Sequence, residues 1–150
     1  MESFLRAAPV PGRRIANYRN SSKRLIRLLG LGERGIGIAR DVAKRGFGNV
    51  EIMTNARPVG WDDIARERSG ERTNMIVVVC GEGDERLFSP SRGRPDMLVT
   101  FVVLKDIDHS ADETLAIDEP RLAQMRGQSD LFVTTSDSDY VGELIENLAS

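Results

Sequence analysis

The fold is decided by one stretch, in which the apolar run Leu25-Ile26-Arg27-Leu28-Leu29 leads into the glycine-rich turn Gly30-Leu31-Gly32-Glu33-Arg34-Gly35. The apolar run is short and ends abruptly at a glycine, which favours a strand over a helix. From about Gly35 to Arg45 the apolar residues recur at three- and four-residue spacing, which is typical of a helix with one apolar face. The stretch therefore predicts a strand, a tight turn and a helix in immediate succession.

The same alternation of strand and helix continues along the chain. Further strands are predicted at 50–54, 75–80, 98–104 and 131–135, and further helices at 61–68, 119–126 and 137–148. The strand at 75–80 is apolar throughout, so we expect it to be central and covered on both faces. Residues 81–95 read as a long loop. The sequence predicts a three-layer, Rossmann-like α/β sheet of about five mainly parallel strands flanked by helices.

Composition places these elements in one domain at residues 23–150, after a flexible basic N-terminal arm at 1–22. Residues 1–48 carry 11 Lys and Arg against 3 Asp and Glu, whereas residues 49–150 carry 10 against 20. The basic half either binds an anionic partner or neutralises the acidic half, and the scarcity of aromatics argues against nucleic acid. The single cysteine, Cys80, and the absence of a secretory signal or a long apolar run predict a cytoplasmic protein with no membrane partner.

The pattern Gly-x-Gly-x-x-Gly between a strand and a helix is the context in which such turns bind phosphate. Gly30 would allow the turn out of the strand, Gly32 would let a phosphate approach the backbone, and Gly35 would let the helix approach the sheet closely. The amides at the helix N-terminus, with Arg34, would then contact the phosphate. The alternative is that a tight junction of strand and helix needs these glycines without any ligand.

Two families share features with this part of the chain. The stretch from Leu25 to Thr54 resembles the opening βαβ unit of Rossmann NAD(P)-binding domains. It also resembles the start of the FtsZ/tubulin-like GTPases, through Gly46-Phe47-Gly48-Asn49-Val50-Glu51-Ile52. Either resemblance implies a bound nucleotide and covers about 30 of the 150 residues.

The chain departs from both families at informative positions. NAD-specific Rossmann domains carry an acidic residue at the end of the second strand, where this chain has Thr54 and Asn55, with Arg57 just beyond. The arginine suits a 2′-phosphate, so the resemblance implies NADP or another nucleotide rather than NAD. FtsZ-like proteins carry a glycine- and threonine-rich second loop, whereas Gly81-Glu82-Gly83-Asp84-Glu85 is acidic and lacks threonine. A polymerising GTPase is therefore not expected.

The predicted cofactor site lies at the carboxyl edge of the sheet. If the strand at 75–80 neighbours the first strand, the two glycine loops flank one crevice, at the position where ligands bind in such sheets. The acidic loop would hold ribose hydroxyls or a phosphate-bound Mg²⁺, or would simply be solvated. The predicted cofactor-binding residues are Gly30, Leu31, Gly32, Glu33, Arg34, Gly35, Asn55, Arg57, Gly81 and Gly83.

No catalytic or metal-binding residues are predicted. The cluster Asp106, Asp108, His109, Asp112 and Glu113 matches no defined metal loop and reads as a solvated acidic link. Cys80 reads as a core residue, and no Gly-x-Ser-x-Gly motif occurs. The sequence favours a nucleotide-binding sensor or accessory module that is not an enzyme on its own. The alternatives are a degenerate FtsZ-like domain, a small reductase or GTPase completed by a protein partner or a second copy, and a structural or regulatory interaction domain without nucleotide.

Overall fold

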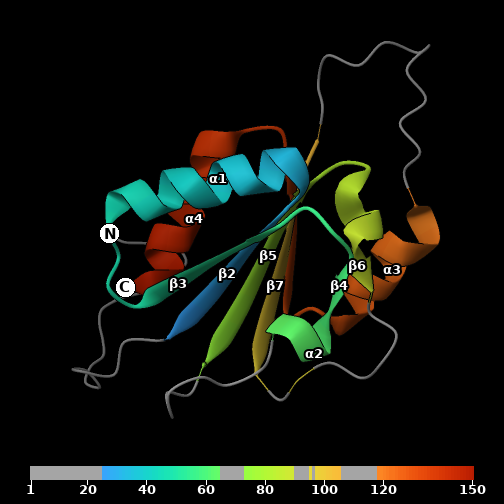
Figure 1. Cartoon of the computed structure of the whole chain (residues 1–150), viewed down its shortest axis with the longest axis horizontal. Helices are drawn as coiled ribbons and strands as arrows, with labels where there is room; N and C mark the ends of the chain where they lie inside the picture. Colours follow the sequence, from blue (N-terminus) through green and yellow to red (C-terminus); the bar gives the residue numbers. More distant parts are fainter. Residues whose placement is uncertain (1–24, 65–72, 90–94, 96, 106–117) are drawn as a thin grey trace.

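A computed structural model describes residues 25–64, 73–89, 95, 97–105 and 118–150 (Figure 1). Its centre is a five-stranded sheet in which every pair of neighbouring strands is parallel. The strand order across the sheet is β3-β2-β5-β7-β8. The strands are β2 (Ile26–Leu31), β3 (Val50–Asn55), β5 (Met75–Gly81), β7 (Leu98–Leu104) and β8 (Leu131–Thr135). This confirms the predicted α/β fold class with a parallel sheet.

In the described part of the chain, four α-helices flank the sheet in two layers. One layer holds α1 (Gly32–Arg45) and α4 (Ser138–Ala149), and the other holds α2 (Trp61–Ile64) and α3 (Glu119–Gln128) (Figure 1). The second layer also holds a short 3₁₀ helix, η2 (Asp84–Leu87), and a two-stranded parallel sheet of β4 (Val59–Gly60) and β6 (Phe88–Ser89). None of the helices in the described residues is long and apolar enough to cross a membrane.

The central strand β5 is buried along its whole length, and its alternate residues face two separate cores. Met75, Val77 and Val79 belong to the core under α1 and α4. Ile76, Val78 and Cys80 belong to the core under α2 and α3, where the rings of Trp61, Phe88 and Phe101 pack edge to face or tilted. A strand with both faces covered must be apolar at every position, which explains the unbroken apolar run.

The order of the strands reverses between β2 and β5. The chain leaves β2, passes through α1 and forms β3 along one edge of β2. It then crosses back, and β5 pairs with the opposite edge of β2. In open parallel sheets the loops that leave the carboxyl ends of two such strands diverge and leave a crevice. The condition on which the predicted crevice depended, that the first strand neighbours the strand at 75–80, is met by the pairing of β2 with β5.

Several predicted boundaries differ from the structure. β2 continues through Gly30 to Leu31, and α1 begins at Gly32 rather than near Gly35, so the turn between them is almost absent. The predicted loop at 81–95 contains η2 and β6 in its described part. The predicted arm at 1–22, the end of the helix predicted at 61–68 and the acidic cluster at 106–113 lie outside the described residues.

Candidate functional site

Three of the predicted loops meet the carboxyl edge of the sheet side by side. Leu31, the last residue of β2, pairs with Asn55 of β3 on one side and with Cys80 of β5 on the other. The glycine-rich turn, the segment after Asn55 and the segment after Gly81 therefore leave the sheet at the same level. This register brings together three segments that lie 24 to 49 residues apart in the sequence.

Gly30 and Gly35 serve the close approach of α1 to the sheet. A Cβ atom at Gly30 would lie 2.7 Å from the carbonyl carbon of Gly35 and 2.9 Å from the Cβ of Ala39. A Cβ atom at Gly35 would overlap the backbone carbonyl oxygen of Val79 in β5. The predicted role of Gly35 in helix–sheet contact is confirmed. Gly30 has the same role, because it lies within β2 and its missing side chain makes room for the helix.

Gly32 is the first residue of α1 and has a φ of 72°. This left-handed conformation favours glycine. The residue before it, Leu31, is the N-cap of α1, and its apolar side chain makes no capping hydrogen bond. By contrast, the carboxylates of Asp118 and Asp137 cap α3 and α4 by accepting hydrogen bonds from first-turn backbone amides. The N-terminus of α1 is thus the one among these three that lacks a side-chain cap.

The carboxylate of Asp84 lies against Gly32. A Cβ atom at Gly32 would be 2.6 Å from Cγ of Asp84 and would overlap one carboxylate oxygen. Asp84 belongs to η2, which follows β5, so the contact joins the two loops that flank the switch between β2 and β5. The space over Gly32 where a phosphate was predicted therefore already contains an acidic group.

The electrostatic environment of Asp84 is unfavourable for its charge. Partial burial raises the pKa of Asp84, the negative charges of Glu85 and Glu33 raise it further, and Arg34 opposes them. Among the residues that the structure describes, none donates a hydrogen bond to this carboxylate. The N-terminus of α1 therefore faces a carboxylate that is close but not hydrogen-bonded.

Arg34 does not face the space over Gly32. Its guanidinium group donates to the carbonyl oxygens of Leu104 (3.1 Å) and Lys105 (3.3 Å), at the carboxyl end of β7. To reach them the side chain passes over Gly81, where a Cβ atom would lie 3.0 Å from Cδ of Arg34. A side chain at position 81 would crowd this crossing, through which Arg34 links α1 to β7.

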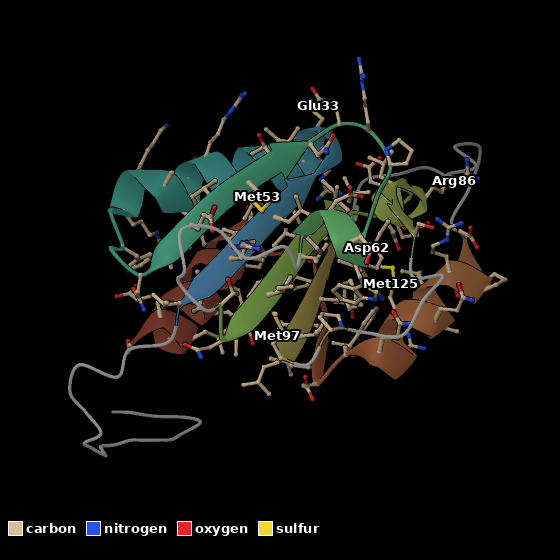
Figure 2. The ribbon with its side chains drawn as sticks, turned by 60° about the horizontal axis from the view of Figure 1, so that its bottom comes forward. Glu33, Met53, Asp62, Arg86, Met97 and Met125 are labelled. Carbon is tan, nitrogen blue, oxygen red and sulfur yellow. The ribbon has the colours of Figure 1, made fainter. Side chains whose placement is uncertain are left out.

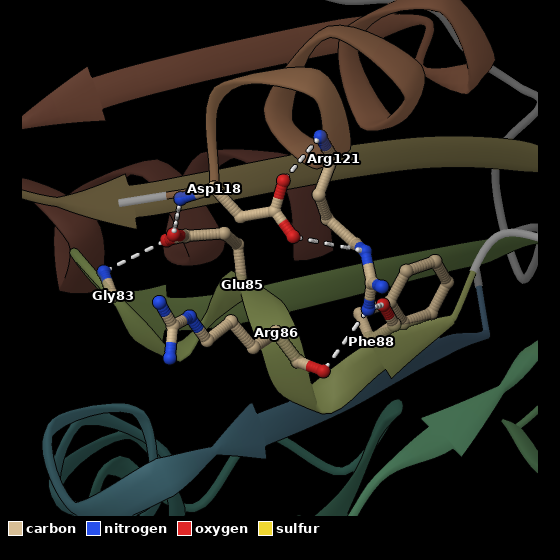
Figure 3. Close-up of polar contacts among 6 residues, drawn as sticks. All are labelled: Gly83, Glu85, Arg86, Phe88, Asp118 and Arg121. Carbon is tan, nitrogen blue, oxygen red and sulfur yellow. Dashed lines mark hydrogen bonds and ion pairs between the residues drawn. The ribbon is translucent and has the colours of Figure 1, made fainter. Parts of the chain in front are cut away.

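The segment after β5 is held in place by hydrogen bonds to the carboxylate of Glu85, which is fully buried (Figure 3). Its carboxylate accepts hydrogen bonds from the backbone amides of Gly83 (2.8 Å) and Asp118 (2.7 Å). Asp118 in turn caps α3, and Arg121 donates to the carbonyl oxygens of Arg86 (3.0 Å) and Phe88 (2.6 Å). This network fixes η2 to the N-terminus of α3. Sequence reasoning missed it, because Glu85 looked like one of several solvated carboxylates.

Asn55 and Arg57 lie beside a different space. Asn55 accepts a hydrogen bond from the amide of Arg57 (2.8 Å) through its side chain, which closes a small turn after β3. Both residues line a hollow of about 270 Å³ on the α2 side of the sheet, together with Leu29, Met53, Asp63 and Ile64. Figure 2 shows Met53 on β3 on this side of the sheet. None of the lining residues belongs to the glycine-rich turn, so the predicted site residues form two neighbouring groups.

Of the remaining candidates, the structure describes Cys80. Cys80 is buried, and this burial, with Glu85 and Asp84 nearby, raises its pKa to about 12, so the thiol stays protonated and unreactive. Within the described ranges, no group of three or more His, Cys, Asp or Glu side chains is arranged to hold a metal ion.

The protein is thus an α/β protein with a parallel sheet. The strand order of this sheet reverses next to the glycine-rich turn, at the carboxyl ends of β2 and β5. No family model, curated protein or solved structure matches the chain.

Proposed function

We propose that this chain is a nucleotide-binding domain that acts as a cytoplasmic sensor or accessory module. In this proposal the phosphate binds at the N-terminus of α1 and NADP is the preferred nucleotide. The proposal rests above all on the apolar N-cap of α1. A leucine at this position leaves the first-turn amides without the acceptor that a Ser, Asp or Asn would supply. Such amides, with the partial positive charge of the helix N-terminus, attract phosphate groups.

The position of α1 in the fold supports the same proposal. Its N-terminus lies at the switch between β2 and β5, which is where open parallel sheets bind their ligands. Gly32 leaves its backbone open to close approach by a ligand once the Asp84 side chain turns away. A nucleotide that extends from Gly32 toward β3 would reach the hollow beside Asn55 and Arg57. There the arginine suits a 2′-phosphate, and the apolar residues suit a planar ring.

A second candidate is an interaction domain that binds no nucleotide. The observation that favours it is the carboxylate of Asp84, which lies where the phosphate would bind and faces Glu33 and Glu85. In this alternative the glycines serve only the packing of α1 on β2 and β5, and the partner is a protein or a second copy of the chain.

Thermal unfolding with a nucleotide panel separates these two candidates. The full chain is melted with NADP, NAD, GTP, ATP and S-adenosylmethionine, each with and without Mg²⁺. A nucleotide at one hundred times its dissociation constant adds about 2.7 kcal/mol, which is roughly 5–11 °C for a domain of this size. We expect the largest shift with NADP. No shift with any compound would favour the interaction domain.

A pair of variants then tests the location of the site. Gly32→Asp places a second carboxylate at the N-terminus of α1 and should abolish the nucleotide-dependent shift. Gly37→Asp adds the same charge at a position on α1 where a Cβ atom meets nothing within 4 Å, and it should keep the shift. Equal shifts in the two variants would place the nucleotide elsewhere.

A further inference from the structure

The large apolar side chains that stay exposed gather at one edge of the central sheet. Among the residues that the structure describes, they are Leu98 (41 % exposed), Leu131 (39 %) and Tyr140 (43 %). They belong to β7, β8 and α4, and β8 is the edge strand at the opposite end of the sheet from β3. The exposed apolar surface and the β8 edge of the sheet thus coincide.

β8 has none of the features that usually keep an edge strand from pairing. Its sequence, Leu131-Phe132-Val133-Thr134-Thr135, contains no charged residue and no proline, whereas the other edge strand, β3, carries Glu51. Charged residues and prolines on edge strands prevent them from pairing with a strand of another molecule. In the described part of the chain, no strand pairs with the outer edge of β8. That edge is therefore suited to a partner strand.

The backbone groups on the outer edge of β8 belong to Phe132 and Thr134. Successive residues of a strand direct their N–H and C=O groups to alternate edges. The carbonyl oxygen of Thr135 accepts a hydrogen bond from the amide of Lys105, directly after β7 (2.8 Å). Thr135 and Val133 therefore direct their backbone groups toward β7. Phe132 and Thr134 direct theirs to the outer edge.

The helix α4 continues this edge with an apolar stripe. α1 packs on β2, β3 and β5, whereas α4 packs on α1 and β8. Gly142 and Glu146 of α4 face α1, because the guanidinium of Arg45 lies against Gly142 and donates to Glu146 (3.3 Å). Two residues along a helix correspond to a rotation of about 200°. The side chains two residues away from these positions therefore lie on the side of α4 that faces away from α1, and they are Tyr140, Leu144 and Leu148.

A two-fold axis through Val133, perpendicular to the sheet, makes β8 complementary to a second copy of itself. The two strands then run antiparallel, as a symmetric contact between identical edges requires. Phe132 of one copy lies opposite Thr134 of the other, and both direct their N–H and C=O groups across the edge. These groups form hydrogen bonds with each other on both sides of the axis. A two-fold axis at Val133 thus satisfies the outer edge of β8 in both copies.

The same axis makes the stripe of α4 complementary to itself. Val133 lies about 7 Å from the end of β8 and Leu144 about 9 Å from the start of α4, so the two residues are at nearly the same level. Leu144 then meets its own copy at the axis, and Tyr140 meets Leu148 of the other copy. The carboxylate of Glu146 is held on the α1 side of the helix, away from this contact.

We propose that the β8 edge and the Tyr140-Leu144-Leu148 stripe of α4 form the interface of a symmetric dimer, in which two copies of this chain share one continuous sheet. The partner is a second copy because the strand and the helix are each complementary to themselves about the same axis. The proposed nucleotide site lies at β2, β5 and β3, toward the other end of the sheet. The dimer therefore leaves that site accessible, and this inference does not depend on the nucleotide.

The size of the edge indicates how strong the dimer is. α4 has 12 residues and β8 has five, so each is about 17–18 Å long. Three layers of about 10 Å each, formed by α4, the sheet and α3, then give roughly 500 Å² on each copy. The total of about 1,000 Å² is the lower limit for a specific interface. We therefore expect a reversible dimer that dissociates on dilution.

Sedimentation velocity of the full chain, from about 1 to about 200 μM, tests the dimer. We expect the mass to rise with concentration toward twice 16.6 kDa. Thr134→Lys places a cation opposite Phe132 of the other copy, whose ring already lies under Arg126 (4.8 Å), and should weaken dimerisation at least about tenfold. Thr54→Lys is the matched control, because Thr54 is also an exposed threonine on an edge strand, β3, and it should leave the dimer unchanged.

Cysteine cross-linking locates the axis independently. Val133→Cys places two thiols opposite each other across the axis, at the Cβ separation of about 4.5–5.5 Å that is found in antiparallel pairs. We expect a disulfide-linked dimer after mild oxidation with diamide. Ile52→Cys, at a partly buried position on β3, should form none. The native Cys80 is buried, and its thiol stays protonated.

The outcomes distinguish the dimer from its location. A chain that stays monomeric at every concentration refutes the dimer. A dimer that Thr134→Lys weakens no more than Thr54→Lys does, or in which Val133→Cys forms no cross-link, refutes the β8 interface. Should Thr134→Lys fail to fold, as judged by far-UV circular dichroism, the cross-link decides alone. Because these measurements use no nucleotide, their failure leaves the proposed function unaffected.

Discussion

Replacing Gly35 by alanine tests how closely α1 packs on the sheet. The new Cβ atom would overlap the carbonyl oxygen of Val79 and lie 3.2 Å from the carbonyl carbon of the same residue. Both atoms belong to the backbone of the central strand β5 and cannot rotate away, so the helix must move outward. Overpacking of this kind typically costs about 1–3 kcal/mol. Because the obstacle is rigid, we expect a loss in the upper part of that range.

Gly37→Ala provides the reference, because Gly37 lies on the same helix and a Cβ atom there meets nothing within 4 Å. Alanine in place of glycine inside a helix stabilises a protein by about 0.5–1 kcal/mol, and both variants share this gain. The difference between them isolates the contact with Val79. We expect about 2–3 kcal/mol, or roughly 4–12 °C in melting temperature, by urea and thermal unfolding followed by far-UV circular dichroism. Two variants of equal stability would show that α1 does not pack against β5 at this position.

Three further predictions concern the acidic residues around the site and the helix caps. The pKa of Asp84 is higher in the folded chain than its ordinary value of 3.8, which applies to the unfolded chain. Its ionisation therefore lowers the free energy of unfolding as the pH rises from 3.8 through the pKa of the folded chain. Asp84→Asn should therefore be more stable than the wild-type chain at neutral pH, and urea unfolding should show that this gain disappears below pH 3.8. A difference in the free energy of unfolding that stays constant at all pH values would contradict the burial of the Asp84 charge. Glu85→Gln replaces one of the two accepting oxygens by an NH₂ group, so one buried backbone amide loses its acceptor. The free energy of unfolding, measured with urea, should fall by about 1–3 kcal/mol. A variant as stable as the wild-type chain would mean that Glu85 does not accept hydrogen bonds from Gly83 and Asp118. Asp137→Ala removes the cap of α4 and should lower the free energy of unfolding by about 1 kcal/mol, while Asp62→Ala on α2 should change it by less than about 0.5 kcal/mol.

The pattern of the sequence predicted the order and type of the main elements, because the inner strands β5 and β7 are nearly continuous apolar runs that are buried on both faces of the sheet. Two of the predicted strands, 98–104 and 131–135, match β7 and β8 residue for residue. The beginning of α1 could not be placed, because Gly30 extends the strand and Gly32 begins the helix in a conformation that no local pattern distinguishes from a turn.

The predicted site was harder to derive than the fold, because its decisive contacts join residues that are distant in sequence. The contact of Asp84 with Gly32 and the crossing of Arg34 to Leu104 depend on how the loops pack after the sheet has formed. The burial of Glu85 depends on the amide of Asp118, 33 residues further along the chain. Asp118 before Glu119-Pro120 is a recognisable start of a helix. Nothing in that pattern shows that the backbone amide of Asp118 donates to the carboxylate of Glu85.

The most direct test of the central claim is the amide NMR spectrum of the full chain, labelled with ¹⁵N and titrated with NADP. If the phosphate binds at the N-terminus of α1, the largest shifts belong to the amides of Gly32, Glu33, Arg34 and Gly35, with smaller shifts at Asp84 and Arg57. Binding that leaves these α1 amides unchanged, or no binding at all, would contradict the assignment and leave the glycine-rich turn a packing device between α1 and the sheet.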